Sequence, residues 1–212
     1  MVDIRIINTK SQLKAALFEC LKEKSLREVK IKDIISVSGV STRTFYQYYS
    51  DVDNLIEEIE KEFIEGYRKS IEKDRDVILD VDYSLPIEKQ FETVLNSAKN
   101  TIAFCFERKE EIQTLLSDNG DIRFYNLIYK TSCDEFLKRA TTMKSTSGIK
   151  LSSKQRLLFD INVQVFVHCM IDLVSVLLKY DDRLSPYDVR QSIFDFLHKT
   201  PLDRINEIIQ DN

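Results

Sequence analysis

Apolar residues recur at three- and four-residue intervals along most of the chain, which is the pattern of amphipathic helices. The first such stripe runs from Leu13 to Leu21. Just before it, Thr9 and Gln12 have the spacing of a capping box, in which each side chain bonds the other residue's backbone amide. The pattern therefore predicts a first helix that opens at this pair and ends near Lys24.

Two short helices are expected next, over about 32–38 and from Ser41 to near Tyr49. Gly39 lies between them, and glycine readily adopts the left-handed backbone that commonly ends a helix. Ser41 is a suitable N-cap for the second helix. One face of that helix is apolar and is expected to pack against the helix before it. The residues of this contact are Ile31, Ile34 and Val37 on one side, and Val40, Phe45 and Tyr49 on the other.

Ser50 and Asp53 open a predicted long helix whose single apolar seam runs from Leu55 to Tyr67, with Glu and Lys on its other faces. Such a helix packs along one side and is otherwise exposed, so we interpret 51–73 as a connecting helix. The other expected elements are a loop at 74–84, helices at about 86–107, 108–117, 121–142 and 155–180 (the last after a capping box of Ser152 and Gln155), and helices opening at Pro186 and Pro201.

Composition agrees with an all-α fold of roughly nine or ten helices. The chain has only 4 Gly and 3 Pro among 212 residues. A phosphate-binding loop needs closely spaced glycines, and the glycines here are far apart in sequence. Nucleotide-binding sheets that depend on such a loop are therefore excluded.

The net charge of −4 is unevenly distributed. Residues 1–50 carry nine Lys or Arg and five Asp or Glu, a balance of +4, and the remainder carries 22 and 30, a balance of −8. A basic segment in an acidic chain favours a polyanionic partner for that segment alone.

Three short helices with a glycine-containing turn between the second and third form a helix-turn-helix unit, whose last helix enters the major groove of DNA. Thr42, Arg43, Tyr46 and Gln47 are predicted to point outward from that helix, with Thr44 beside them. Arginine pairs with guanine and glutamine with adenine, while threonine and tyrosine hydroxyls also contact phosphates. A structural three-helix unit with an incidental polar face is the alternative interpretation.

Residues 10–56 resemble the DNA-binding domain of the tetracycline-repressor (TetR) family. The resemblance lies in the first helix and in Ile34, Gly39-Val40-Ser41, Phe45-Tyr46, Tyr49 and Leu55. It implies a helix-turn-helix DNA-binding domain at 1–50 and a helical ligand-binding and dimerisation domain at 51–212. It further implies a homodimer on a two-fold-symmetric double-stranded DNA operator, which a small-molecule effector usually releases.

Carried over by position, the family's base contacts fall on Thr42, Arg43 and Thr44, and its phosphate-contacting tyrosine falls on Tyr46. The full set of DNA contacts we expect is Lys32, Ser41, Thr42, Arg43, Thr44, Tyr46, Gln47 and Tyr48.

Three positions depart from the family's pattern. Val52 replaces the lysine common at the start of the fourth helix and is flanked by Asp51 and Asp53. Tyr48 replaces the usual histidine, and Ile35 occupies a position that is normally small. The first departure removes a phosphate contact and adds repulsion, so DNA binding would depend more on Lys10, Lys30 and Lys32.

The segment 157–178 contains 16 apolar residues in 22 and a narrow polar stripe. A helix that is apolar on nearly all sides is buried on nearly all sides, by its own chain or by a second copy. Three interpretations of the stripe stay open, namely a solvated seam, a cavity wall and a subunit contact. The stripe consists of Asp160, Gln164, His168, Asp172 and Ser175.

We expect an apolar or amphipathic effector in an aromatic-lined cavity. The predicted pocket residues are Phe104, Tyr125, Tyr129, Gln164 and His168. The predicted dimer contact, a four-helix arrangement about a two-fold axis, uses Leu173, Leu177, Val189, Ile193, Phe194 and Leu197.

Other functions find little support in the sequence. With two histidines and four widely spaced cysteines, the chain offers no readable metal site, cofactor motif or nucleophile–base pair, so no enzyme is expected. The first residues lack a signal-peptide pattern, and no run reaches the roughly 18 uninterrupted apolar residues of a membrane span, so we expect a cytoplasmic protein. A regulator of the same fold that acts through a protein partner, or as a co-activator with weak DNA binding, is the alternative function.

Overall fold

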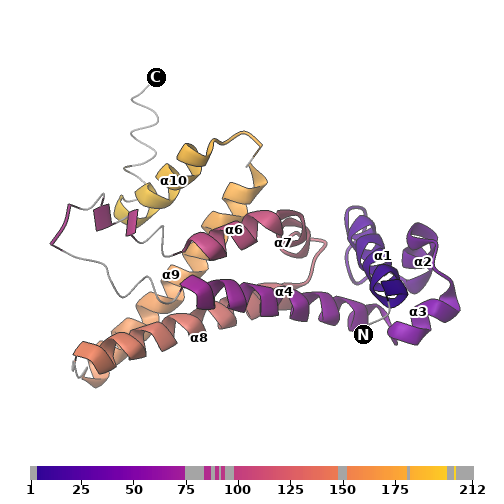
Figure 1. Ribbon diagram of the computed structural model, residues 1–212, viewed down its shortest axis with the longest axis horizontal. Helices are drawn as coiled ribbons and strands as arrows, with labels where there is room; N and C mark the ends of the chain where they lie inside the picture. Colours follow the sequence, from indigo (N-terminus) through magenta and orange to yellow (C-terminus); the bar gives the residue numbers. More distant parts are fainter. Residues whose placement is uncertain are drawn as a thin grey trace. The chain divides into compact units, whose positions relative to one another are not determined.

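The structure is a computed structural model that describes residues 4–74, 84–86, 89–90, 92–93, 98–147, 152–180, 182–199 and 203. Within these residues it contains nine α-helices and no strand, which confirms the predicted all-α fold (Figure 1). The helices are α1 (Ile4–Leu21), α2 (Ile31–Ser38), α3 (Thr42–Tyr48), α4 (Val52–Asp74), α6 (Lys99–Glu107), α7 (Lys109–Leu115), α8 (Ile122–Ser147), α9 (Ser153–Lys179) and α10 (Pro186–His198).

The chain forms two compact units. The first comprises Met1–Ser70 and Ala103–Phe136, and the second comprises Ile71–Ile102 and Leu137–Asn212. The first unit thus extends beyond the DNA-binding domain expected at 1–50. Its buried core includes Leu13, Leu17, Ile34, Phe45, Phe63 and Phe124, and that of the second includes Val163, Val167, Leu178 and Ile193.

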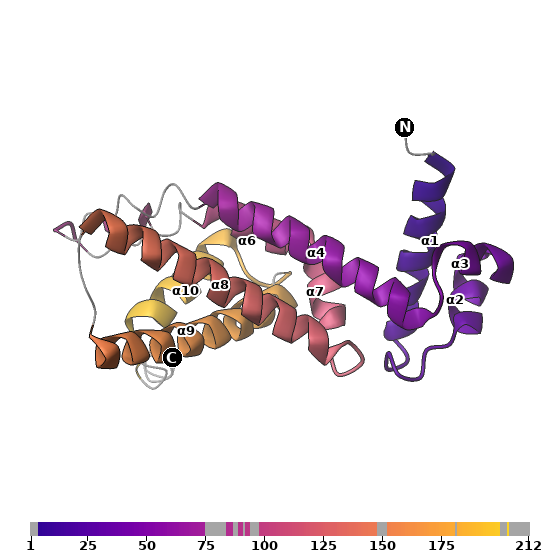
Figure 2. The same cartoon turned by 90° about the horizontal axis from the view of Figure 1, so that it is seen from below.

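In the first unit, α2 and α3 pack beside α1 (Figure 2). Gly39 ends α2 with a φ of 69°, in the left-handed region where glycine is favoured. The Ser41 hydroxyl accepts a hydrogen bond from the backbone N–H of Thr44 at 3.1 Å and so caps α3. Both turn residues therefore act as predicted.

The first helix differs from its prediction at both ends. It begins at Ile4, and the Thr9 hydroxyl donates to the Arg5 carbonyl at 2.8 Å within the helix. Thr9 and Gln12 therefore form no capping box, because the helix already extends over the residues before them. The helix ends at Leu21 rather than near Lys24.

Val37 was expected to pack against α3, but its side chain is 53% exposed. The α2–α3 contact is instead centred on Ile34 and Phe45, which are fully buried, and on Tyr49. The glycine turn rotates α3 relative to α2, so that one of the apolar positions on α2 faces solvent.

A carboxylate on α4 holds that helix against α1 and the end of α3. Glu58 accepts hydrogen bonds from the ammonium groups of Lys10 and Lys14, at 2.6 Å and 2.9 Å, and from the Tyr49 hydroxyl at 2.9 Å. Burial favours the neutral carboxyl, but the lysine and tyrosine hydrogen bonds prevail and lower the pKa of Glu58 to about 2. The connecting helix is therefore fixed to the domain that precedes it.

Aromatic rings join α4 to α6 and α8 in the first unit. Phe63 packs edge-on against Phe104 and Phe124, with ring centroids 5.1 Å and 4.9 Å apart. Gly66 permits the close approach of α6, because a Cβ there would lie 2.7 Å from the Phe104 ring. The Tyr67 hydroxyl bonds the Ser132 hydroxyl on α8 at 2.9 Å.

Within the second unit, the last residue of α4 caps α6. The buried Asp74 carboxylate accepts the backbone N–H groups of Asn100 and Thr101, at 3.0 Å and 2.8 Å, together with a side-chain bond from each residue. Negative charge is favourable at a helix N-terminus, so this contact fixes the entry to α6.

The later helix starts agree with the sequence. The capping box of Ser152 and Gln155 is present ahead of α9, and Ser185 caps α10 with Pro186 at its first position. Helix α8 runs to Ser147, five residues past its predicted end. Most of the expected loop at 74–84, much of the start of the expected helix at 86–107, and the Thr200–Pro201 helix start lie outside the described residues.

Candidate DNA-binding interface

The outer face of α3 carries most of the residues expected to contact DNA. Tyr46 is 57% exposed, and Ser41, Thr42, Arg43 and Gln47 are also exposed. Phe45 and Tyr49 are buried on the opposite side and fix the rotation of the helix. The structure therefore brings a hydrogen-bonding set together on one short helix. Thr44 and Tyr48 lie half-buried at its edges.

Thr44 has a local structural contact as well. Its hydroxyl lies 2.8 Å from the Ser41 hydroxyl, beside the N-cap bond. A threonine held in this way presents its methyl group and one remaining hydrogen-bonding position. Its contribution to a DNA surface is therefore smaller than that of Thr42 or Arg43.

The expected cations differ in how available they are. Lys32 and Arg43 are exposed, and no ion pair is recorded for either within the described part of the chain. Lys10, by contrast, is bound to Glu58. The sequence predicted that Lys10, Lys30 and Lys32 would compensate for the missing lysine at the start of the fourth helix. Of these three, Lys30 and Lys32 are exposed.

The acidic residues at the start of α4 are engaged within the fold. The Asp51 carboxylate accepts the backbone N–H of Asn54 at 2.7 Å and so caps α4. Asp53 lies 3.3 Å from the Arg123 guanidinium. These contacts offset part of the repulsion that Asp51 and Asp53 would exert on a nearby phosphate.

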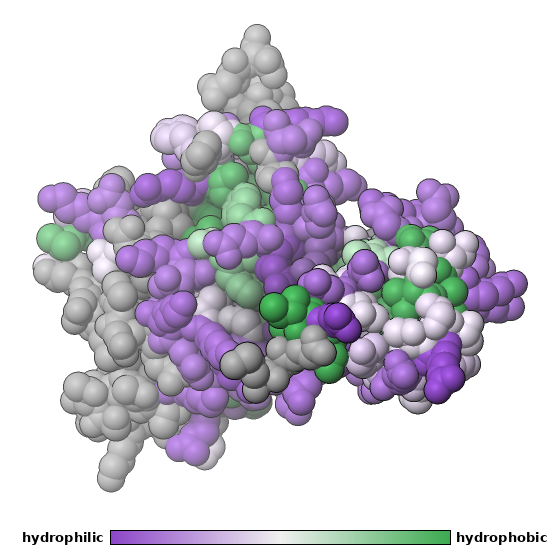
Figure 3. Space-filling model, turned by 45° about the vertical axis from the view of Figure 1, so that its right-hand side comes forward, coloured by the Kyte–Doolittle hydropathy of each residue, from purple (hydrophilic) through white to green (hydrophobic). Residues whose placement is uncertain are grey.

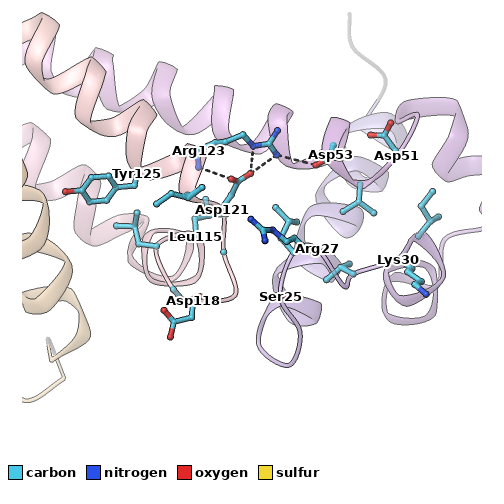
Figure 4. A pocket seen from close by; sticks show the side chains of 18 of the residues that line it. Ser25, Arg27, Lys30, Asp51, Asp53, Leu115, Asp118, Asp121, Arg123 and Tyr125 are labelled. Atoms are coloured by element: carbon cyan, nitrogen blue, oxygen red, sulfur yellow. Dashed lines mark hydrogen bonds and ion pairs between the residues drawn. The ribbon is translucent and has the colours of Figure 1, made fainter.

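Arg123, at the start of α8, was not identified from the sequence. Its guanidinium contacts Asp121 at 2.6 Å and Glu57 at 3.7 Å, in addition to Asp53 (Figure 4). The hydrogen bond that Arg123 donates to the Asp121 carboxylate raises the pKa of Arg123 above its usual value. No sequence signal joins positions 53 and 123, because the contact depends on how α8 packs against α4.

The same region contains a hollow of about 1350 Å³ in the first unit (Figure 4). Its wall comes from the α1–α2 loop, the start of α4 and the α7–α8 turn, and it includes Lys32 and Tyr125 from the predicted sets. Two hydrogen bonds join the end of α1 and the loop after it to the α7–α8 turn. They run from the Leu26 N–H to the Asn119 carbonyl at 2.8 Å and from the Asn119 side chain to the Leu21 carbonyl at 3.1 Å.

The other predicted pocket residues lie elsewhere. Phe104 is part of the aromatic cluster with Phe63, and Tyr129 is half-buried on α8. Gln164 and His168 belong to the second unit and are exposed on α9. An effector cavity lined by all five therefore remains a prediction.

The predicted dimer residues differ in burial within the single chain. Leu177, Val189 and Ile193 are buried in their own unit, so their part in a subunit contact remains a prediction. Leu173, Phe194 and Leu197 are half-buried. The apolar residues that α9 does expose are Leu157, Leu158, Ile161, Val165 and Val176.

These exposed side chains are unusual for a charge-rich chain. On the face drawn in Figure 3, hydrophobic residues form separate patches among mainly hydrophilic ones. Among the described residues, α9 is also the one helix with the length and composition of a membrane-spanning segment, a test that core helices of soluble proteins pass as well.

Comparison with known proteins gives two informative similarities. No protein-family model matches the chain. It is 24% identical over 123 residues to YxbF, an uncharacterized HTH-type transcriptional regulator of Bacillus subtilis (strain 168), and the match covers 58% of this chain but only 30% of that protein. A crystal structure described as "Putative TetR-family transcriptional regulator from Syntrophomonas wolfei str. Goettingen" superposes with a TM-score of 0.59 at 13% identity, over 89% of this chain and 92% of the other.

Proposed function

We propose that this chain, whose fold is that of TetR-family transcriptional regulators, is a sequence-specific DNA-binding regulator that reads its operator with α3. The observation that carries the proposal is the exposed set on α3, in which Thr42, Arg43 and Tyr46 project from a helix fixed by buried Phe45. Both comparisons are with transcriptional regulators, and we assign no catalytic residue.

Arg43 is the central base-reading residue in this proposal. A guanidinium offers two parallel donors to the O6 and N7 atoms of guanine. Thr42 and Tyr46 supply the hydroxyl and methyl contacts that set the register on phosphates and thymines. Lys32, at the start of α2, adds a phosphate contact.

The proposed assembly is a homodimer on a two-fold-symmetric operator. Two recognition helices reach successive turns of the major groove only when a symmetry axis relates them. The exposed apolar residues of α9, from Leu157 to Val176, supply a surface of the kind that permanent dimers bury. A bilayer is a poor partner for the same helix, because Asp160 and Asp172 would lie in hydrocarbon. We place the protein in the cytoplasm on this basis.

The proposed output is repression relieved by a small apolar or amphipathic effector. It rests on the resemblance and on the aromatic side chains between about 86 and 142. An alternative output, through a protein partner with weak DNA binding, is favoured by one feature, the absence of a cation at Val52.

The salt dependence of duplex binding tests the proposal and separates it from the partner alternative. Each phosphate contact lowers the logarithm of affinity by about 0.9 for each tenfold increase in salt concentration. Two DNA-binding domains with several phosphate contacts each therefore give an affinity that falls steeply with salt. We expect binding to a random-sequence duplex at 50 mM salt that weakens at least 100-fold or so by 200 mM. A protein that acts through a partner alone would show no measurable binding at either concentration.

A further inference from the structure

Two buried carboxyl groups meet where α4 packs against the α7–α8 turn. Glu60, on α4, is 3% exposed, and its Oε1 atom has no hydrogen-bond partner. Asp121, at the end of the turn, is 7% exposed, and its negative charge acts on Glu60. Two carboxyl groups this close and this buried do not both ionise readily, because each negative charge raises the cost of the other.

One cation faces the pair. Arg123 donates from its backbone N–H and its Nε to Asp121, at 2.8 Å and 2.7 Å. The other charges around Glu60 are Glu57 on its own helix and, through Arg123, Asp53. Asp121, Asp53 and Glu57 all contact the Arg123 guanidinium, whose charge also acts on Glu60. The carboxyl groups thus outnumber the cation, so at least one proton is expected to stay in the cluster near neutral pH.

The energetics of Glu60 agree with this arrangement. Burial, followed by the charge of Asp121, raises the pKa of Glu60 to about 7, and Arg123 opposes the shift without cancelling it.

We propose that Glu60 and Asp121 form a proton-binding site that tunes DNA affinity through Arg123. With the proton bound, the pair carries one negative charge and Arg123 bridges it to Asp53 and Glu57 on α4. With the proton lost, the second buried charge draws Arg123 toward the pair. Asp53, a few residues after α3, is then left uncompensated beside the phosphates. The part of this proposal that concerns DNA rests on the proposed function, and the proton site itself does not.

The effect on stability has a defined sign. Because the pKa of Glu60 is higher in the folded state than the ordinary value of 4.5, the folded chain retains a proton that the unfolded chain releases. The resulting stabilisation is fully present below pH 4.5 and is lost as the pH rises to about 7. Glu58, whose pKa is lowered, acts in the opposite sense only below its ordinary value, so it adds nothing to a comparison of pH 5 with pH 8.

The first test needs no DNA. Urea unfolding of the full chain is measured at pH 5 and pH 8 for the wild type, for Glu60→Gln and for the matched control Glu65→Gln, an exposed glutamate on the same helix. We expect the urea concentration at the unfolding midpoint to be lower at pH 8 than at pH 5 for the wild type and the control. The decrease should be clearly smaller for Glu60→Gln. A loss in Glu60→Gln equal to that of the wild type overturns the proton site.

A second variant, Asp121→Asn, tests the proton site even if Glu60→Gln does not fold. Asp121→Asn removes the neighbouring charge, so the pKa of Glu60 falls and the pH dependence of unfolding shifts to lower pH. An unchanged profile in Asp121→Asn contradicts the pairing of the two carboxyl groups.

The regulatory half is tested with duplex DNA at fixed salt. We expect the wild type to bind about three- to tenfold more weakly at pH 8 than at pH 6. The reason is that Asp53, no longer compensated by Arg123, would then repel a nearby phosphate. Glu60→Gln and Asp53→Asn should bind with little dependence on pH. A wild type that binds equally at both values overturns the regulation even if unfolding supports the proton site. A chain that binds no DNA at either pH contradicts the proposed function instead.

Discussion

Helices α3 and α9 each bury one apolar face, and they differ in what they leave exposed. Helix α3 presents Thr42, Arg43, Tyr46 and Gln47 to solvent, which are donors and acceptors on a short, locally capped helix. Helix α9 presents aliphatic side chains such as Ile161, which is 48% exposed, along 27 residues. The first surface is suited to a polar ligand with fixed hydrogen-bonding positions, and the second to an apolar surface of similar length.

The comparison shows how the two surfaces would depend on each other. A single head with one arginine at its tip makes few contacts and binds weakly. Linking two heads through α9 makes the second binding event intramolecular, which strengthens binding without any new contact to DNA. In the proposed assembly, the affinity that α3 can reach therefore depends on the pairing of α9.

The most damaging change is expected on α9. Replacing Ile161 and Val165 with aspartate places two charges in the proposed dimer surface. We expect a monomer by light scattering and operator binding weakened about 100-fold or more, in line with the loss of bivalency. Asn162→Asp, a single exposed charge on the neighbouring side of the helix, is the control and should remain a dimer. A double variant that stays dimeric would move the interface away from this face.

The next largest effect is expected on α3. Arg43→Ala removes the one arginine of that helix and should weaken operator binding about 5- to 150-fold, the equivalent of one bidentate base contact. Discrimination among single-base variants of the operator should also flatten. Arg68→Ala, which removes an exposed arginine from α4, controls for net charge. Wild-type affinity in Arg43→Ala would show that α3 does not read bases.

A smaller effect is expected where α4 contacts α1 and the end of α3. Glu58→Gln removes the charge that Lys10, Lys14 and Tyr49 share, and should lower the free energy of unfolding by about 1–2 kcal/mol at pH 7. The pKa of Glu58 is lowered in the folded state, so this contribution is present above pH 4.5 and is lost as the pH falls to about 2. Denaturant unfolding at pH 7 and pH 3 measures it, with Glu65→Gln as the control. An equal loss at both pH values would contradict the pKa assignment.

The smallest effect is expected for a phosphate contact. Lys32→Ala should weaken all duplexes about equally and reduce the salt slope by about 1 per bound head. Titrations of one operator and one random duplex at three salt concentrations measure both quantities. A variant that loses affinity for the operator alone would assign Lys32 to base reading.

The turn and helix cap between α2 and α3 were predictable from sequence, because they depend on residues close together in the chain. Gly39 and Ser41 act through their own backbone and the next turn, and the buried Phe45 follows from helical spacing. The capping box at Thr9 failed because an earlier start was equally compatible with helix formation. A motif that looks complete can thus lie inside a longer helix.

The features that could not be predicted are contacts between elements distant in sequence. Arg123 reaches Asp53 across 70 positions, and Asp121 meets Glu60 across a helix packing that no pattern specifies. On α10, helical spacing identified Ile193 as part of an apolar stripe but not which neighbour covers it. The sequence therefore indicates which side chains are apolar, while the tertiary structure decides whether the chain itself or a partner buries them.

Selection of duplexes from a random library tests the central claim most directly. Purified wild-type chain and an Arg43→Ala, Tyr46→Phe double variant are each cycled against the same library, and the bound sequences are read. We predict that the wild type enriches a two-fold-symmetric sequence with half-sites about one helical turn, or a multiple of it, apart, and that the double variant does not. Enrichment of the same sequences by both proteins, or of none by the wild type, would contradict the assignment of α3 as the DNA-reading helix.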